Sequence, residues 1–410
     1  MPQMVIVADE SIPCVPELFG RFGEIRRISG RDIRRADLSD AHVLLVRSVT
    51  TVNRALLEGS RVQFIGSATI GIDHVDVEYL RSAGITFAYA PGSNADSVAE
   101  YVTAAILRLC IRRAERLRGQ KVGIVGAGEI GGRLAVRLRL MGFDVLLNDP
   151  PRETALWEAG RKSDFRELGE VLTEADIVSL HVPLVYDGPH PTIHLFDQSR
   201  LEQMKPGSWL LNTSRGAVVD NSALLRSLQE SRGPAAVVLD VWENEPEPNA
   251  DLVQKVDLAT PHIAGYALDA KVRGTYVLYD ALRHHLGFED NSVTPHPGEE
   301  ASRRSDMLSQ IATPCMKGLK SRPLLIGAPD PLLPDTEWMD MFARHMYDIE
   351  EDDRAMRSII GRRGIDAASF SSLRSNYRTR REFSIHSVPK SMLRRERRLV
   401  VEQTFRVGLT

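Results

Sequence analysis

The stretch KVGIVGAGEIGGRLAVRLRLMG, residues 121–142, joins an apolar strand pattern to a helical pattern through the glycine-rich loop GAGEIG. A G-x-G-x-x-G pattern is informative only where a strand precedes it and a helix follows it, and this stretch contains both. Gly126 permits the tight turn, Gly128 lets the backbone approach a pyrophosphate, and Gly131 lets helix and strand pack closely. The N-terminus of the helix supplies N–H donors for phosphate oxygens. The stretch therefore predicts a dinucleotide-binding Rossmann domain.

The second strand of this pattern, DVLLNDP, ends in Asp149, eighteen residues after Gly131. A carboxylate at about this spacing hydrogen-bonds the ribose hydroxyls of a dinucleotide. The same carboxylate would repel a 2′-phosphate, so NAD is favoured over NADP. The alternative is that Asn148, Asp149 and Pro150 form only a turn.

Short apolar runs alternate with longer amphipathic segments up to about residue 290. Continuously apolar runs are typical of strands covered on both faces, as in parallel sheets, and the intervening segments are long enough for helices. One such helix is predicted over residues 96–113. The sequence thus predicts an α/β fold with two Rossmann-like, doubly wound parallel sheets. The predicted strands are 4–9, 42–48, 62–68 and 85–90 in one series and 121–126, 144–149, 175–183, 208–214, 235–242 and 256–263 in the other.

The composition is that of an ordinary globular protein, with 43% hydrophobic and 26% charged residues and a net charge of −3. This balance predicts neither nucleic acid nor an acidic membrane as a partner. Cys14, Cys110 and Cys315 are odd in number and far apart, which favours a reducing compartment over a disulfide framework. The N-terminus does not have the pattern of a signal peptide, and there is no apolar run long enough to span a membrane. We expect a cytoplasmic protein.

His262 lies in the largely apolar segment LATPHIAGYA, residues 258–267. It is either a core histidine with a hydrogen-bond partner or a general acid/base, and the second role requires a carboxylate to orient the ring. Asp240 lies at the end of another predicted strand and Glu245 five residues later, and both supply candidate carboxylates. Arg215 follows the strand before that, and its guanidinium can grip a substrate carboxylate through two parallel hydrogen bonds. Ligands bind at such strand ends in open α/β sheets.

Four motifs in this order and spacing resemble those of the D-isomer-specific 2-hydroxyacid dehydrogenase family. The resemblance extends over roughly the first 290 residues and implies two Rossmann-like domains with a cleft between them. It implies NAD as the cofactor and a catalytic set of Arg215, Glu245 and His262, with Glu243 as the competing carboxylate. In the implied reaction, a hydride leaves the substrate C2 for nicotinamide while His262 accepts the hydroxyl proton. The motifs are GAGEIG (126–131), NTSRGAVVD (212–220), DVWENEP (240–246) and TPHIAGY (260–266).

The resemblance also implies further binding residues and no metal site. For Ser48 and Thr69, the alternative is that their hydroxyls only satisfy loop backbone groups. Val182 stands where relatives often have a small polar residue, so its contact would be made through the backbone, and its neighbour His181 is interpreted as structural. The expected cofactor-binding residues are Gly126, Gly128, Glu129, Ile130, Gly131, Asp149, Val182, Thr213, Ser214, Asp240 and Gly265, and the expected substrate-binding residues are Ser48, Thr69 and Tyr266.

The segments HIAGYALDAKVRGT (262–275) and FSSLRSNYRTRREF (370–383) resemble one branch of the family more closely. That branch oxidises 4-phospho-D-erythronate, a phosphorylated 2-hydroxy acid, to its 2-oxo acid in vitamin B6 biosynthesis, and its C-terminal domain forms a homodimer. The resemblance implies a substrate domain of residues 1–96 and 267–290, an NAD-binding domain of residues 97–266 and an α+β dimerisation domain of residues 291–410.

Two other functions stay open at this point. One is another D-2-hydroxyacid dehydrogenase, of the phosphoglycerate or glyoxylate type, and the other is a non-catalytic NAD(H)-sensing protein of the same fold. The basic segment RRERRL (394–399) has no aromatic ladder beside it, so a solvated helical face or an oligomer contact is favoured over nucleic-acid binding. The basic tail can also contribute to binding the substrate phosphate.

Overall fold

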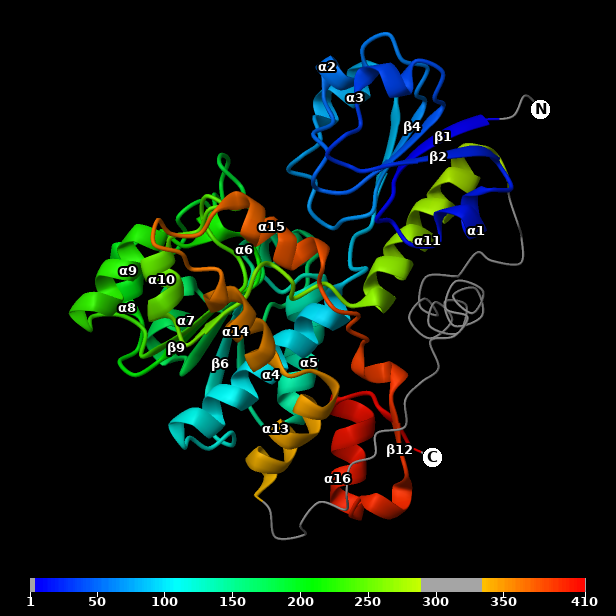
Figure 1. Ribbon diagram of the computed structural model, residues 1–410. Helices are drawn as coiled ribbons and strands as arrows, with labels where there is room; N and C mark the ends of the chain where they lie inside the picture. The colour runs from blue at the N-terminus through cyan, green and yellow to red at the C-terminus, as the bar shows by residue number, and fades with distance from the viewer. Residues whose placement is uncertain (1–3, 289–333, 410) are drawn as a thin grey trace. The chain divides into compact units, whose positions relative to one another are not determined.

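The computed structural model describes residues 4–288 and 334–409, which form two compact units (Figure 1). The first unit contains residues 4–94 and 268–288, and the second contains residues 95–267 and 334–409. Cys315 and the polar segment that follows residue 290 lie outside the described residues.

The first unit is a parallel five-stranded sheet with the strand order β2-β1-β3-β4-β5. Apolar side chains cover both faces, with Ile6 and Phe64 in one core cluster and Val7 and Ile65 in the other. Its strands are β1 (Met4–Asp9), β2 (Gly23–Ile28), β3 (Val43–Val46), β4 (Phe64–Ser67) and β5 (Thr86–Tyr89), and its helices are α1 (Val15–Phe19), η1 (Arg35–Leu38), α2 (Arg54–Leu57), α3 (Val77–Ser82) and α11 (Leu268–His285).

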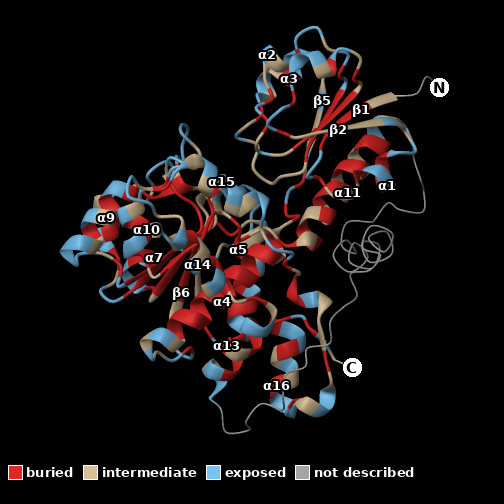
Figure 2. Cartoon of the chain, viewed as in Figure 1, coloured by how far each residue is buried: buried red, intermediate tan, exposed pale blue. Residues whose placement is uncertain are grey.

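The two edge strands of this sheet depart from the sequence prediction. Strand β2 (GEIRRI) was missed, because its charged residues interrupt the apolar run on which the prediction depends. Strand β5 was expected to be buried, but it lies at the other edge, and both Thr86 and Tyr89 are exposed. Figure 2 shows the burial of the central strands. An edge strand has a neighbour on one side only, so its sequence need not be continuously apolar.

Helix α11 belongs to the first unit although it follows the segment that contains His262. Leu278, Tyr279 and Leu282 are buried in the same cluster as Ile6. The chain therefore returns to its first sheet after completing the second.

The second unit is built on a parallel six-stranded sheet with the order β11-β10-β9-β8-β6-β7. The prediction of two parallel-sheet α/β units is thus confirmed. Each predicted strand of this series contains an observed one. The strands are β6 (Lys121–Val125), β7 (Asp144–Asn148), β8 (Ile177–Leu180), β9 (Trp209–Asn212), β10 (Ala236–Leu239) and β11 (Leu258–Ala259), and the helices up to residue 255 are α4 (Ala95–Arg113), α5 (Glu129–Leu140), α6 (Pro150–Glu158), α7 (Leu168–Glu174), α8 (Gln198–Gln203), η2 (Gly216–Val218), α9 (Asn221–Glu230) and α10 (Ala250–Lys255).

The described C-terminal segment, residues 334–409, is mainly helical and packs within this second unit (Figure 1). Trp338 and Phe405 are buried in the core cluster that contains most of α4. Arg397, from the basic segment, is itself buried, and its guanidinium lies 5.0 Å from the centre of the Trp338 ring. The elements are α13 (Asp335–Met346), α14 (Ile349–Ser358), α15 (Ala367–Ser375), η3 (Phe383–Ile385), β12 (Ser387–Val388), η4 (Lys390–Met392), α16 (Arg395–Leu399), η5 (Val400–Thr404) and β13 (Gly408–Leu409). Within residues 4–288 and 334–409, every helix is too short or too polar to cross a membrane.

Candidate active site

The candidate site residues of the second unit follow the carboxyl ends of neighbouring strands. Arg215 follows β9, Glu245 follows β10 and His262 follows β11, and these three strands are adjacent in the sheet. Because the strands are parallel, their carboxyl ends meet at one edge, which is where open α/β sheets bind ligands. The order of the strands alone therefore brings the three side chains together.

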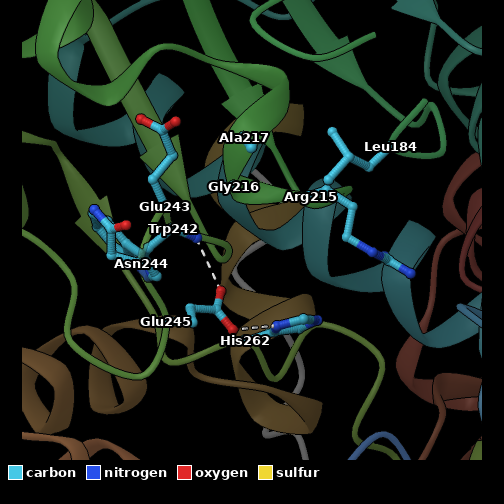
Figure 3. Close-up of a pocket in the computed structure, with 9 residues that line it drawn as sticks. All are labelled: Leu184, Arg215, Gly216, Ala217, Trp242, Glu243, Asn244, Glu245 and His262. Atoms are coloured by element: carbon cyan, nitrogen blue, oxygen red, sulfur yellow. Dashed lines mark hydrogen bonds and ion pairs between the residues drawn. The ribbon is translucent and has the colours of Figure 1, made fainter. Parts of the chain in front are cut away.

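His262 and Glu245 form a hydrogen-bonded pair (Figure 3). His262 Nδ1 lies 2.8 Å from Glu245 Oε2. The other oxygen, Oε1, accepts a hydrogen bond from the Trp242 backbone N–H at 2.9 Å. His262 has a φ of 59°, a left-handed conformation that is uncommon for a residue with a side chain. The pair orients the imidazole and leaves Nε2 as the nitrogen available to a ligand.

The Glu245 carboxyl is held in its ionised form. Burial alone would raise its pKa, but the charge and hydrogen bond of His262, the Arg374 cation and the Trp242 N–H together lower the pKa below its ordinary value. An ionised carboxylate at Nδ1 fixes the imidazole tautomer and stabilises the imidazolium that forms when Nε2 takes a proton.

A pocket of about 260 Å³ borders this pair, and Arg215 lies on its wall (Figure 3). Arg215 Nη1 donates to the Ser214 carbonyl at 2.8 Å, and the Asn212 side chain donates to the Arg215 carbonyl at 2.9 Å. A Cβ on Gly216 would lie 1.9 Å from the Trp242 carbonyl carbon, so the glycine is needed for the two loops to approach. The lining residues are Leu184, Arg215, Gly216, Ala217, Trp242, Glu243, Asn244, Glu245 and His262.

The glycine loop joins β6 to α5 and has the geometry that a pyrophosphate requires. Gly126 has a φ of 90°, which glycine adopts without strain, and a Cβ there would meet His181 and Val182. At Gly128 a Cβ would meet nothing within 4 Å, so this backbone is open to a ligand. At Gly131 a Cβ would lie 2.0 Å from the Gly126 carbonyl oxygen, so only glycine fits. The loop therefore fits a dinucleotide above the N-terminus of α5, where Glu129 and Ile130 begin the helix.

Asp149 caps helix α6 and also contacts the glycine loop. Oδ1 accepts the Arg152 N–H at 3.2 Å, and Oδ2 accepts the Ala127 N–H at 2.9 Å. The Arg152 guanidinium donates to the Ala127 carbonyl. Residues 148–150 do not form a simple turn, because Asn148 ends β7, Asp149 is the N-cap and Pro150 begins α6. The carboxylate lies beside the glycine loop, and its contact with a dinucleotide stays a prediction.

Other residues that were predicted to bind the cofactor form hydrogen bonds within the protein. Asp240 is 1% exposed, and its oxygens accept hydrogen bonds from the Thr260 hydroxyl and from the Ile263 and Ala264 N–H groups. Asp240 therefore anchors the loop that carries His262, and its contact with a cofactor stays a prediction. Ser214 donates through its hydroxyl to the Asn212 side chain at 2.8 Å.

His181 is half-buried, and its ring lies between two hydroxyls. Its Nε2 lies 2.9 Å from Ser179 Oγ, and its Nδ1 lies 3.4 Å from Thr213 Oγ1. Burial lowers the pKa of His181 to about 3, so the ring is neutral. This supports its interpretation as a structural residue. Val182 and Gly265, predicted to contact the cofactor, are both half-buried.

Ser48 and Thr69 lie in the first unit, where they follow the adjacent strands β3 and β4. Ser48 is exposed. The Thr69 hydroxyl lies 2.7 Å from Ser67 Oγ and donates to the Gly71 carbonyl at 2.9 Å. Thr69 thus satisfies a loop backbone group, and the two hydroxyl residues share one edge of this sheet.

Two features were missed by the sequence analysis. Glu243 pairs with His194 at 2.6 Å and accepts the Asn221 N–H at 2.8 Å, so the carboxylate that competed with Glu245 has its own partners. Arg374 of helix α15 lies over the ring of Tyr266, with its Cζ 5.6 Å from the ring centre. No motif around Arg374 indicated this, because the contact depends on how a distant segment packs.

The chain matches proteins of known family over its whole length. It is 49% identical to the erythronate-4-phosphate dehydrogenase of Salinibacter ruber over 412 residues, covering 100% of both chains. It is 43% identical to the enzyme of the same name from Escherichia fergusonii, covering 93% of both. Residues 98–264 match the family described as D-isomer specific 2-hydroxyacid dehydrogenase, NAD binding domain. The chain belongs to the D-isomer-specific 2-hydroxyacid dehydrogenase family.

Solved structures share the fold of this chain. The TT0316 protein of Thermus thermophilus is 25% identical with a TM-score of 0.58, covering 69% of this chain and 97% of its own. The D-lactate dehydrogenase of Aquifex aeolicus, solved with NAD and lactic acid, is 24% identical with a TM-score of 0.57, covering 69% and 96%. Residues 333–400 match a domain of unknown function, DUF3410. As a 2-hydroxyacid dehydrogenase, the chain is an NAD-dependent oxidoreductase.

Proposed function

We propose that this dehydrogenase oxidises 4-phospho-D-erythronate at C2 to (R)-3-hydroxy-2-oxo-4-phosphonooxybutanoate, a step in the biosynthesis of pyridoxal 5′-phosphate. The observation that carries this proposal is the 49% identity to a curated erythronate-4-phosphate dehydrogenase over all of both chains. That match includes the C-terminal segment, whereas the two solved structures each cover 69% of this chain. The substrate assignment therefore depends on more than the fold.

In this reaction His262 is the general base. Its Nε2 accepts the proton of the C2 hydroxyl, while Nδ1 stays bonded to Glu245 Oε2 at 2.8 Å. The Glu245 carboxylate stabilises the imidazolium that results. NAD, when bound, supplies the acceptor for the C2 hydride. In the reverse direction the imidazolium of His262 returns the proton to the carbonyl oxygen.

Arg215 is proposed to hold the substrate carboxylate and the C2 oxygen. It borders the same pocket as His262, and a guanidinium presents parallel N–H donors that match a carboxylate. Ser48, Thr69 and Tyr266 are proposed to contact the remaining polar groups of the substrate.

The glycine loop and the strand ends are proposed to hold NAD. Asp149 receives the adenosine ribose, and the open backbone at Gly128 receives the pyrophosphate. Glu129, Ile130, Val182, Thr213, Ser214, Asp240 and Gly265 are proposed to line the remainder of the cofactor site.

Steady-state NADH formation with a panel of 2-hydroxy acids tests the substrate. We expect the highest kcat/KM with 4-phospho-D-erythronate. A strong preference for 3-phosphoglycerate, or for glyoxylate in the reverse reaction, would move the chain to another branch of its family. Tight NADH binding without turnover of any acid would favour a sensor.

Two properties of the assembled protein are proposed on the likeness to the B6 enzymes. The C-terminal segment forms a homodimer. Size-exclusion chromatography with light scattering tests this by measuring the molar mass of the eluted protein, which should be twice that of one chain. The location is cytoplasmic, in keeping with three cysteines that are odd in number and far apart in the sequence.

A further inference from the structure

Helix α15 is anchored beside the loop that carries Glu245. Phe370, in the middle of the helix, is fully buried in the core cluster that contains Trp242, and Leu373 packs against the same cluster. Arg374 is the next residue, in the last turn of the helix. Its backbone is thus held in place by the core of the second unit.

The Arg374 guanidinium is held by an aromatic ring and has no anion bound to it. Its Cζ lies 5.6 Å from the centre of the Tyr266 ring, and Nε is buried without a hydrogen-bond partner. Tyr266 itself packs edge-on against Tyr377, with the ring centres 5.9 Å apart. Among the described residues, no carboxylate forms an ion pair with Arg374. Its cation does reach Glu245 electrostatically and helps to lower the pKa of that carboxyl.

Neighbouring arginines of the same segment form polar contacts with the protein, although Arg380 Nε, like Arg374 Nε, is buried without a hydrogen-bond partner. Arg378 forms ion pairs with Glu351 and Asp352. Arg380 is buried and donates to the carbonyl oxygens of Ser97 and Ala264. The guanidinium N–H groups of these two side chains therefore attach the segment, whereas Arg374 donates no hydrogen bond and forms no ion pair among the described residues.

A partly desolvated cation without a counter-ion is costly, and an anionic ligand would remove that cost. Glu245 does not act as the hydrogen-bonded counter-ion of Arg374, because one of its oxygens is bonded to His262 and the other to the Trp242 N–H. A phosphate matches a guanidinium better than any neutral group, since the two bind through parallel charge-assisted hydrogen bonds. The contact with the Tyr266 ring, with Arg374 Cζ 5.6 Å from its centre, restricts the side chain and so limits the entropy lost on binding.

We infer that Arg374 binds the phosphate of the substrate, and that this contact selects a phosphorylated acid over an unphosphorylated one. The inference rests on the proposed function and deepens it, because the substrate has two anionic ends. Arg215 takes the carboxylate beside His262, and Arg374 takes the phosphate beside Tyr266. The C-terminal segment thereby contributes to specificity as well as to packing.

The test compares two ligands in two variants of the full-length protein. For Arg374→Gln, kcat/KM with 4-phospho-D-erythronate should fall roughly tenfold to hundredfold, the range expected for one charge-assisted hydrogen bond. The inhibition constant of D-erythronate, which lacks the phosphate, should stay within about twofold of wild type, because its binding does not involve the lost contact. Arg374→Lys should retain part of the kcat/KM. Arg363→Gln, at an exposed arginine before α15, is the matched control and should change neither constant.

Three results would overturn the inference. One is unchanged kcat/KM in Arg374→Gln, and another is an equal loss for both ligands, which would indicate a structural role or an effect through Glu245. The third result concerns the Lys variant and is needed if Arg374→Gln melts at a lower temperature than wild type. If Arg374→Lys melts at the wild-type temperature and inorganic phosphate inhibits it as strongly as it inhibits wild type, the inference is wrong. The oxidation of 4-phospho-D-erythronate by the wild-type protein is measured first. If there is no oxidation, the proposed function itself is wrong, independently of any variant.

Discussion

His262 Nδ1 and Glu245 Oε2 lie 2.8 Å apart, although 17 residues separate them in the chain. Adjacent parallel strands, β10 and β11, bring the two loops together. The same loops are tied by Trp242, whose indole N–H donates to the Thr260 carbonyl at 2.9 Å. The loops that carry the pair are therefore held together by a buried tryptophan, while the two side chains themselves are only partly buried.

Replacing His262 by alanine should remove the general base. We expect kcat to fall by about 10² to 10⁴ while the affinity for NADH stays within about threefold, since the ring supplies proton transfer and not cofactor binding. Stopped-flow turnover and a fluorescence titration with NADH measure the two effects. His284→Ala, at an exposed histidine of α11, is the control. Wild-type turnover in His262→Ala would disprove the assignment.

Glu245 and Glu243 are separated by a matched pair of amide variants. Burial alone would raise the pKa of Glu245, but His262 and its other partners lower it on balance, so the carboxylate is ionised at neutral pH and is protonated only as the pH falls below the ordinary carboxyl range. Glu245→Gln should lower kcat by about 10²-fold or more, and Glu243→Gln, bonded to His194, by less than about tenfold. The reverse order in steady-state assays would exchange their roles.

Asp149→Asn tests the choice between NAD and NADP. Asparagine is also a good helix N-cap, so α6 should keep its start. Losing the charge should weaken NADH binding by about tenfold and remove the repulsion of a 2′-phosphate, so the ratio of the Kd for NADPH to that for NADH should fall. Titrations with both cofactors measure this ratio. Asp144→Asn, at an exposed position in β7, should leave it unchanged.

The sequence was most informative where burial and function impose local patterns. The central strands of the second sheet are buried throughout, so they have continuous apolar runs in the sequence, and Arg215, Glu245 and His262 lie in the loops that follow three strands of the sheet. The edge strand β2 has no such pattern, because only part of it is buried.

Arg374 illustrates the other limit of the sequence. Its position over Tyr266 depends on α15 packing against strands more than a hundred residues earlier in the chain, and no local periodicity encodes that docking. The arginine-rich tail was recognised as basic, but charge density alone does not distinguish Arg378, which pairs with carboxylates, from Arg374, which does not.

Alanine at Gly128 should weaken cofactor binding, whereas alanine at Gly131 should lower the stability of the fold. A Cβ at Gly128 meets nothing within 4 Å, so Gly128→Ala should melt near the wild-type temperature but bind NADH more weakly, because the methyl group occupies the approach of the pyrophosphate. A Cβ at Gly131 would lie 2.9 Å from Ile124 and closer still to the loop backbone, so Gly131→Ala should cost about 1–3 kcal/mol of stability. Calorimetry and NADH titration separate the two. Equal melting temperatures would contradict the packing argument.

Glu100, in the buried helix α4, should make the protein less stable at high pH. Burial raises its pKa to about 8, with Arg137 and Arg380 opposing the shift and Glu382 adding to it. Because the folded pKa lies above the unfolded value of about 4.5, the stability that the protonated carboxyl contributes is complete below pH 4.5 and is lost as the pH rises through 8. Glu100→Gln cannot ionise, so its melting temperature should exceed that of wild type by an amount that grows from pH 5 to pH 9, on the order of 5 °C.

The control for this last prediction is Glu170→Gln, at an exposed carboxylate of α7 in the same unit. The difference between its melting temperature and that of wild type should not change with pH, because its side chain is exposed and lies outside the buried cluster around Glu100. If Glu100→Gln also ran parallel to wild type, Arg137 and Arg380 would be holding the Glu100 carboxylate ionised at neutral pH. The cluster that fastens the C-terminal segment to α4 would then be a buried ion network and not a protonated acid beside two arginines.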